Sequence, residues 1–94
     1  MNLKTFEATL EDAAPPPGLS AALAALWHER RGDWDEAHRQ AQSQDDAEGA
    51  WVHAYLHRVE GDHGNAAYWY RRAGRALCSA PLEEEWAEIV DALL

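Results

Sequence analysis

The stretch from Ala50 to Ala73, AWVHAYLHRVEGDHGNAAYWYRRA, decides the fold. Two helix-forming runs flank the pair Gly61-Asp62, in which a glycine can end one helix and an aspartate can cap the next. The first run carries two apolar stripes, made of Val52, Tyr55, Leu56 and Val59 and of Ala50, Trp51 and Ala54. A helix that is apolar over so much of its circumference packs on more than one neighbour. The stretch therefore predicts a helical hairpin whose first helix is central.

The same plan occurs earlier in the chain at an offset of 29 residues, where Gly32-Asp33 corresponds to Gly61-Asp62. Repeated helical hairpins stack on one another and need a cap at the open end of the stack. We therefore predict one helical domain of about five helices over residues 1–94. Its parts are an N-terminal segment with a proline-rich connection (1–18), a first hairpin (19–43), a second hairpin (46–77) and a capping helix (80–94).

Local signals set the expected helix ends. Asp33 with Glu36, and Asp45 with Glu48, have the spacing of a capping box. The fourth helix is expected to continue to Leu77. In the last helix, Leu82, Trp86, Ile89, Val90 and Leu93 form the expected buried stripe. Residues 1–13 are compatible with a short helix or a strand, and their place in the core stays open.

Composition narrows the function classes. The 94 residues are 47% hydrophobic and 27% charged, which is typical of a globular domain. The net charge of −9 argues against generic nucleic-acid or membrane-surface binding. The chain has one cysteine, Cys78, no apolar run of the roughly 20 residues that cross a bilayer, and no secretory pattern at its start. We therefore expect a cytoplasmic protein.

Two segments resemble known repeat families. The run from Asp62 to Ala73 resembles the second helix of Sel1-like repeats, D-x-x-x-A-x-x-W-Y-R-K-A, and Gly32 to Ala37 resembles the G-D-Y-D-E-A stretch of tetratricopeptide repeats. The chain is also similar to a group of short uncharacterised bacterial proteins with an A-W-V-H-A-Y-L-H-R and Y-W-Y-R-R-A-G core. These resemblances imply an all-α, tetratricopeptide- or Sel1-like array. The 29-residue period is shorter than the tetratricopeptide period of about 34.

In an array of this kind, an aromatic and arginine-rich groove binds peptides. The expected contact residues are Trp51, His53, Tyr55, His57, Arg58, Tyr68, Arg71 and Arg72. Plain core packing is the alternative for Trp51 and Tyr55. We predict a non-enzymatic, cofactor-free adaptor that binds a protein, a peptide or a second copy of itself, since no nucleophile or phosphate-binding motif is present.

The alternative function is a ligand- or metal-binding domain. His53 and His57 lie four residues apart, so both point from one helix face, and Glu60 follows on that face. The competing interpretation is that one histidine makes a structural hydrogen bond and the other lies at the surface.

The arginines of the fourth helix leave a further choice. Tyr68, Arg72 and Arg75 share one face beside Arg71, an arrangement that can bind anions or RNA. Alternatively, these arginines pair with the acidic last helix, which carries Glu83, Glu84, Glu85, Glu88 and Asp91.

Overall fold

Six α-helices and one 3₁₀ helix make up the computed structural model, which describes all 94 residues. The elements are α1 (Leu3–Ala8), η1 (Thr9–Glu11), α2 (Ala21–Arg30), α3 (Trp34–Ser43), α4 (Ala47–Val59), α5 (His63–Ala73) and α6 (Leu82–Leu93). The all-α prediction is confirmed, with one helix more than expected because residues 3–8 are helical. None of these helices has both the length and the apolar character that crossing a membrane requires.

The two turns at Gly32 and Gly61 have the same backbone geometry. Their φ angles are 83° and 82°, a left-handed conformation that glycine adopts without a Cβ penalty. In both turns the following aspartate N–H donates to a carbonyl five residues back, that of His28 or His57, at 2.9 Å. This is the Schellman arrangement. The repeat that the sequence predicts at this offset is therefore present in the backbone.

Side-chain caps begin five of the helices. The cap of α1 is Asn2, whose side chain accepts from the Thr5 N–H at 2.8 Å. Ser20, Asp33, Asp46 and Asp62 each accept a hydrogen bond from a backbone N–H three residues on. The predicted cap Asp45 is wrong, because its neighbour Asp46 binds the Gly49 N–H at 2.9 Å. The side chains of Asp33 and Asp62 cap the helix that follows, and their backbone N–H groups close the turn that precedes it.

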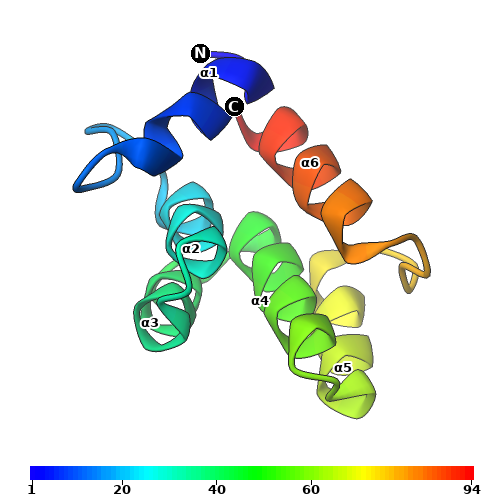
Figure 1. Cartoon of the computed structure of the whole chain (residues 1–94). Helices are drawn as coiled ribbons and strands as arrows, with labels where there is room; N and C mark the ends of the chain where they lie inside the picture. Colours follow the sequence, from blue (N-terminus) through cyan, green and yellow to red (C-terminus); the bar gives the residue numbers. More distant parts are fainter.

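Helix α4 is central, as predicted, and contacts α2, α3, α5 and α6. Figure 1 shows the α2–α3 hairpin on one side of α4 and α5 on the other, with α6 crossing the end of this group and α1 lying against α6. The core therefore lies between α2, α4 and α6. Its largest fully buried side chains include Trp86, Tyr55, Tyr70, Phe6 and Leu26.

The N-terminal segment belongs to this core. Phe6 is fully buried and lies 5.9 Å from the Trp86 ring, centroid to centroid. The Trp27 indole N–H donates to the Thr9 hydroxyl at 3.2 Å, and the Arg31 guanidinium donates to the Leu10 carbonyl at 2.6 Å. These contacts settle the question that the sequence left open.

Two predictions about the second half of the chain are wrong. Helix α5 ends at Ala73, because Gly74 adopts a left-handed conformation with φ 72°, and residues 75–80 are not helical. Leu77 is consequently 67% exposed. Leu82 is 38% exposed, because it is the first residue of α6 and lies outside the buried stripe.

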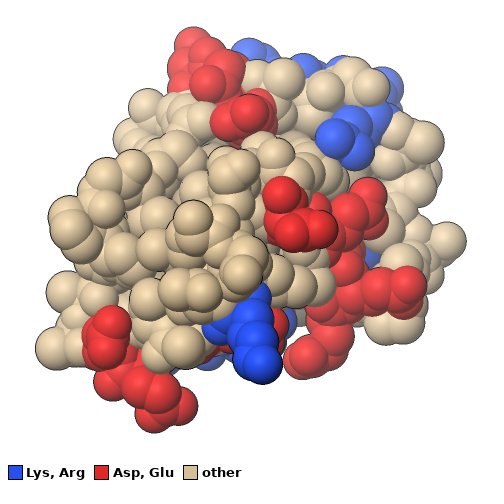
Figure 2. All heavy atoms as spheres, turned by 90° about the horizontal axis from the view of Figure 1, so that it is seen from above, with Lys and Arg blue, Asp and Glu red and all other residues tan.

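The face that carries α1 and the end of α6 is largely uncharged. Figure 2 shows this face from above, with a wide uncharged area and most of the acidic side chains toward its edges. A cavity of about 410 Å³ opens here between the start of α2 and the end of α6. It is lined by Met1, Pro17, Gly18, Leu19, Ser20, Leu23, Leu93 and Leu94.

Candidate functional site

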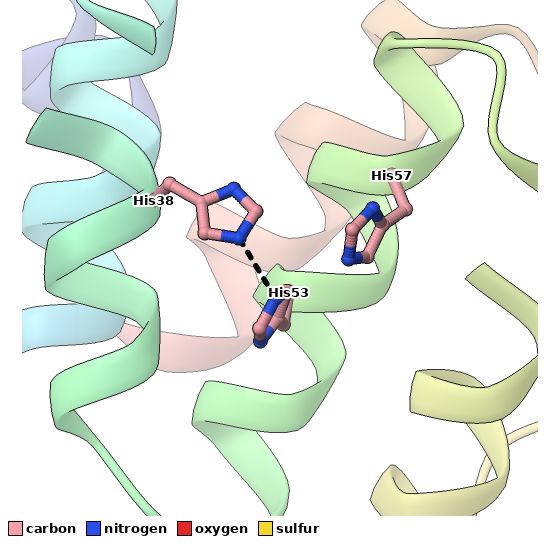
Figure 3. A group of neighbouring side chains, drawn as sticks. All are labelled: His38, His53 and His57. Atoms are coloured by element: carbon pink, nitrogen blue, oxygen red, sulfur yellow. Dashed lines mark hydrogen bonds between the residues drawn. The ribbon is translucent and has the colours of Figure 1, made fainter. Parts of the chain in front are cut away.

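Three histidines from two helices meet at the interface of α3 and α4. Figure 3 shows His38 pointing from α3 toward His53 and His57 of α4. The Nε2 atoms of His38 and His53 lie 3.1 Å apart, and one ring nitrogen from each histidine lies within 4.8 Å of the other two. His53 and His57 are 4% and 8% exposed, and His38 is half-buried. We call these three residues the histidine cluster.

Local structure explains the arrangement. The i, i+4 spacing puts His53 and His57 on one face of α4, as predicted, and their rings stack with centroids 4.9 Å apart. The sequence analysis did not predict His38 as a partner of this pair, because His38 lies in a different helix. A histidine among apolar inward positions was the available signal.

Glu60 lies beside His57 in the second group of possible ligands, His57, Glu60 and Asp62, which does not include His38 and His53. Its Oε1 atom lies 2.6 Å from Nδ1 of His57. A carboxylate only accepts, so Nδ1 of His57 carries the proton and, in the neutral ring, Nε2 keeps a free lone pair. In the structure His38 is the third member of the cluster, and Glu60 instead fixes the tautomer and ring orientation of His57.

Burial favours the neutral form of two members of the cluster, His53 and His38. Burial, followed by the neighbouring His38 and His57, lowers the pKa of His53 to about 4. Burial also lowers the pKa of His38, with His57 as the second cause. The imidazoles of His53 and His38 are therefore uncharged at neutral pH, the form in which a ring nitrogen can bind a cation.

Aromatic rings and a polar cavity border the cluster. Trp69 of α5 stacks on His53 with centroids 3.9 Å apart, and Trp34 lies 5.9 Å from His38. A cavity of about 210 Å³ adjoins His53 on the side of the α3–α4 connection. Its polar lining includes Asp45, Asp46 and Arg72. The cluster thus lies between an apolar wall and a polar opening.

The predicted contact residues do not form one exposed surface. Trp51 and Tyr55 are 4% and 2% exposed, which agrees with the core alternative. The Arg58 guanidinium donates to the buried Glu85 carboxylate at 2.6 Å, and the Tyr70 hydroxyl donates to the other oxygen of Glu85. This network joins α4, α5 and α6. Arg58 is therefore a structural residue in this fold.

The remaining arginines differ in their contacts. Arg71 is exposed. Arg72 lies near Asp45 at 3.8 Å, and its guanidinium donates a hydrogen bond to the Tyr68 hydroxyl at 3.1 Å. The guanidinium of Arg75 lies over the Trp51 ring, 3.3 Å from its centroid. The prediction that the arginines of the fourth helix pair with the last helix is therefore wrong, because the ion pairs to α6 come from Arg58 of α4 and Arg30 of α2.

Comparisons of the chain with models of known protein families, with curated proteins and with solved structures found no match. The resemblance to tetratricopeptide and Sel1-like repeats accordingly stays a prediction.

Proposed function

We propose that this protein is a non-enzymatic binding domain that holds a divalent transition-metal ion of the Zn²⁺ type at His38, His53 and His57. The observation that carries the proposal is the meeting of three ring nitrogens, from two different helices, within 4.8 Å. Imidazole is a preferred ligand of zinc, copper, nickel and iron. A three-histidine set leaves a fourth tetrahedral position open.

The distances support this proposal. Zn–N bonds of about 2.0–2.1 Å in a tetrahedral site require ligand nitrogens about 3.3 Å apart. The Nε2 atoms of His38 and His53 are already 3.1 Å apart, and a ring nitrogen of His57 lies within 4.8 Å of both. Metal binding would release the proton that one of the two Nε2 atoms donates to the other. The hydrogen bond from His57 to Glu60 is the second-shell contact that metal-binding histidines commonly make.

Titration of the metal-free protein with Zn²⁺ tests the proposal, and Co²⁺ absorbance reports whether the site is tetrahedral. We expect one saturable site. His38→Gln, His53→Gln and His57→Gln should each weaken binding about tenfold or more, because each removes a ligand. His28→Gln is the matched control, since His28 occupies the position of His57 in the first hairpin and should leave binding unchanged.

Two results would overturn the metal function. One is the absence of saturable binding in the folded wild-type protein. The other is equal loss of binding in His28→Gln and the cluster variants, which would indicate general surface coordination. Either result would identify the cluster as hydrogen-bonded packing between α3 and α4.

A second candidate function is the predicted adaptor, built on a tetratricopeptide- or Sel1-like stack in which α2, α4 and α6 form the inner layer. It is favoured by a groove of about 580 Å³ between α5 and α6. Trp51 and Tyr70 lie at its floor, and Arg75 and the exposed Leu77 lie along its rim. A chain with this groove offers the aromatic and apolar surface that peptides bind.

A panel of fluorescent peptides of differing charge and hydrophobicity tests the adaptor function. We expect at least one class to bind the wild-type protein, and Leu77→Asp to weaken that binding without changing the thermal melting temperature, because Leu77 contributes to the rim and not to the core. Failure of every peptide class to bind would contradict the adaptor and leave the metal function standing. Sedimentation of the same protein tests the alternative of self-association.

A further inference from the structure

The contact between Arg75 and Trp51 differs from the other arginine contacts in the molecule. The Arg75 guanidinium covers a tryptophan that is only 4% exposed, yet Arg75 itself is exposed and follows the end of α5. Its side chain makes no ion pair within 4.0 Å and no hydrogen bond, unlike Arg39 and Arg58. The stack on Trp51 is therefore its one specific interaction, and no second contact holds it in place.

Two cavities lie on either side of this side chain. One has a volume of about 580 Å³ and the other of about 220 Å³, and both are lined by Trp51, Ala73 and Arg75. Displacement of Arg75 from the ring would join them into a single groove along α6, with the Trp51 ring at its centre.

Carboxylates line both ends of the joined groove. Glu88 lies in the larger cavity and Glu48 in the smaller one, and both are exposed. Guanidinium groups stack on tryptophan faces and pair with carboxylates. The chain carries a net charge of −9, which favours positively charged partners.

We infer that the groove between α4, α5 and α6 binds an arginine side chain from a basic segment of a partner protein, and that Arg75 occupies this arginine site in the free protein. The guanidinium of the partner would replace that of Arg75 on Trp51, and flanking basic residues would pair with Glu48 and Glu88. This inference rests on the adaptor function and is independent of the metal site.

The test measures binding of a fluorescent arginine-containing basic peptide, with the same peptide carrying citrulline in place of arginine as a neutral counterpart. Arg75→Ala should tighten binding of the arginine peptide about three- to thirtyfold, because it removes the internal competitor. Arg39→Ala changes the net charge equally, far from the groove, and should leave affinity as in the wild type. Glu88→Gln should weaken binding about two- to fivefold.

Each other outcome has a defined meaning. Equal affinities of Arg75→Ala and Arg39→Ala would overturn the role of Arg75 as competitor, provided that both variants melt as one folded species. Equal binding of the citrulline peptide would overturn arginine as the recognised group. If neutral or acidic peptides of the panel bind and the basic peptide does not, the adaptor function stands and this inference fails. If no peptide binds, both fail together.

Discussion

The two hairpins share a backbone and differ in what their side chains do. The Gly32 and Gly61 turns are the same in φ and in hydrogen bonding. At equivalent positions, however, the second hairpin has His53, Trp69 and Glu60 where the first has Ala24, Gln40 and Arg31. The first hairpin uses Arg31 to hold the N-terminal segment, whereas the second uses Glu60 to orient His57.

The comparison shows that different residues of the sequence determine the path of the chain and the chemistry of the site. The residues that both hairpins share, glycine and aspartate at the turn and alanine at Ala37 and Ala66, set the path of the chain. The residues at which they differ set the chemistry. The histidine cluster is accordingly a property of the second hairpin and of its contact with α3, and not of the repeat itself.

The largest expected effect tests whether the two hairpins form one folding unit. Leu26 and Tyr55 occupy equivalent buried positions, at 0% and 2% exposure. Leu26→Ala and Tyr55→Ala should each lower the free energy of unfolding by about 3–4 kcal/mol, because each leaves a cavity in the shared core. In urea, tryptophan fluorescence and circular dichroism should give coincident transitions for both variants. Separate transitions would mean that the hairpins unfold independently.

A second prediction concerns pH and sharpens the contrast between His53 and Ala24. In metal-free protein, the unfolded chain takes up a proton at His53 below about pH 6.5, while the folded protein resists until about pH 4. Stability is therefore complete above pH 6.5 and falls with pH, by about 2–3 kcal/mol from this residue. The lowered pKa of His38 acts in the same direction.

His53→Ala, which gives the second hairpin the residue of the first, isolates the contribution of His53 to the pH dependence of stability. Urea unfolding with a chelator present should show a flatter pH profile for the variant than for the wild type. Parallel profiles of the two proteins would contradict the burial of a neutral His53. Protonation of carboxylates affects both proteins and cancels in the difference.

The third prediction tests the equivalence of the turns. Gly32→Ala and Gly61→Ala should each cost about 1–2 kcal/mol, because the left-handed backbone is unfavourable for alanine. A Cβ at either position meets no atom within 4 Å, so the cost is conformational and should be equal at the two sites. Gly64→Ala, within α5 and without a positive φ, should stabilise by about 0.5–1 kcal/mol. Thermal unfolding measures all three, and unequal costs would show that the turns differ.

The smallest effect concerns the caps. Asp33→Ala and Asp62→Ala should each cost about 1 kcal/mol, since each leaves a backbone N–H without its acceptor. Asp46→Ala should behave in the same way, while Asp45→Ala should be close to neutral. Urea midpoints compare the four variants. A larger effect at Asp45 than at Asp46 would contradict the observed cap.

The fold was best predicted from the sequence where only one residue type is compatible with the backbone conformation. A left-handed turn needs glycine, so both turns could be predicted. The central place of α4 could be predicted from its two apolar stripes. The prediction of the N-cap of α4 failed because two adjacent aspartates could both serve as the cap. Only the backbone dihedral angles of the loop determine that Asp46, and not Asp45, is the cap. The end of α5 was missed because the apolar spacing continues to Leu77 although Gly74 stops the helix.

The candidate site was predictable only within one helix. The spacing of His53 and His57 put both on one face of α4. The addition of His38 depends on how α3 is rotated against α4, which no periodicity encodes. The same limit applies to Trp51 and Tyr55. An aromatic stripe on a central helix has the same sequence pattern whether it lines an open groove or packs under a neighbouring helix.

The packing of Phe6 against Trp86 has a consequence for the order in which the molecule is assembled. A ribosome makes the N-terminal segment first, yet its principal aromatic partner belongs to the last helix made. The two hairpins can form from contacts that are local in the sequence while synthesis continues. Thr9 and Leu10 can contact α2 early, but Phe6 gains its aromatic partner only when α6 emerges, so one of the first residues to be synthesised is among the last to complete its packing.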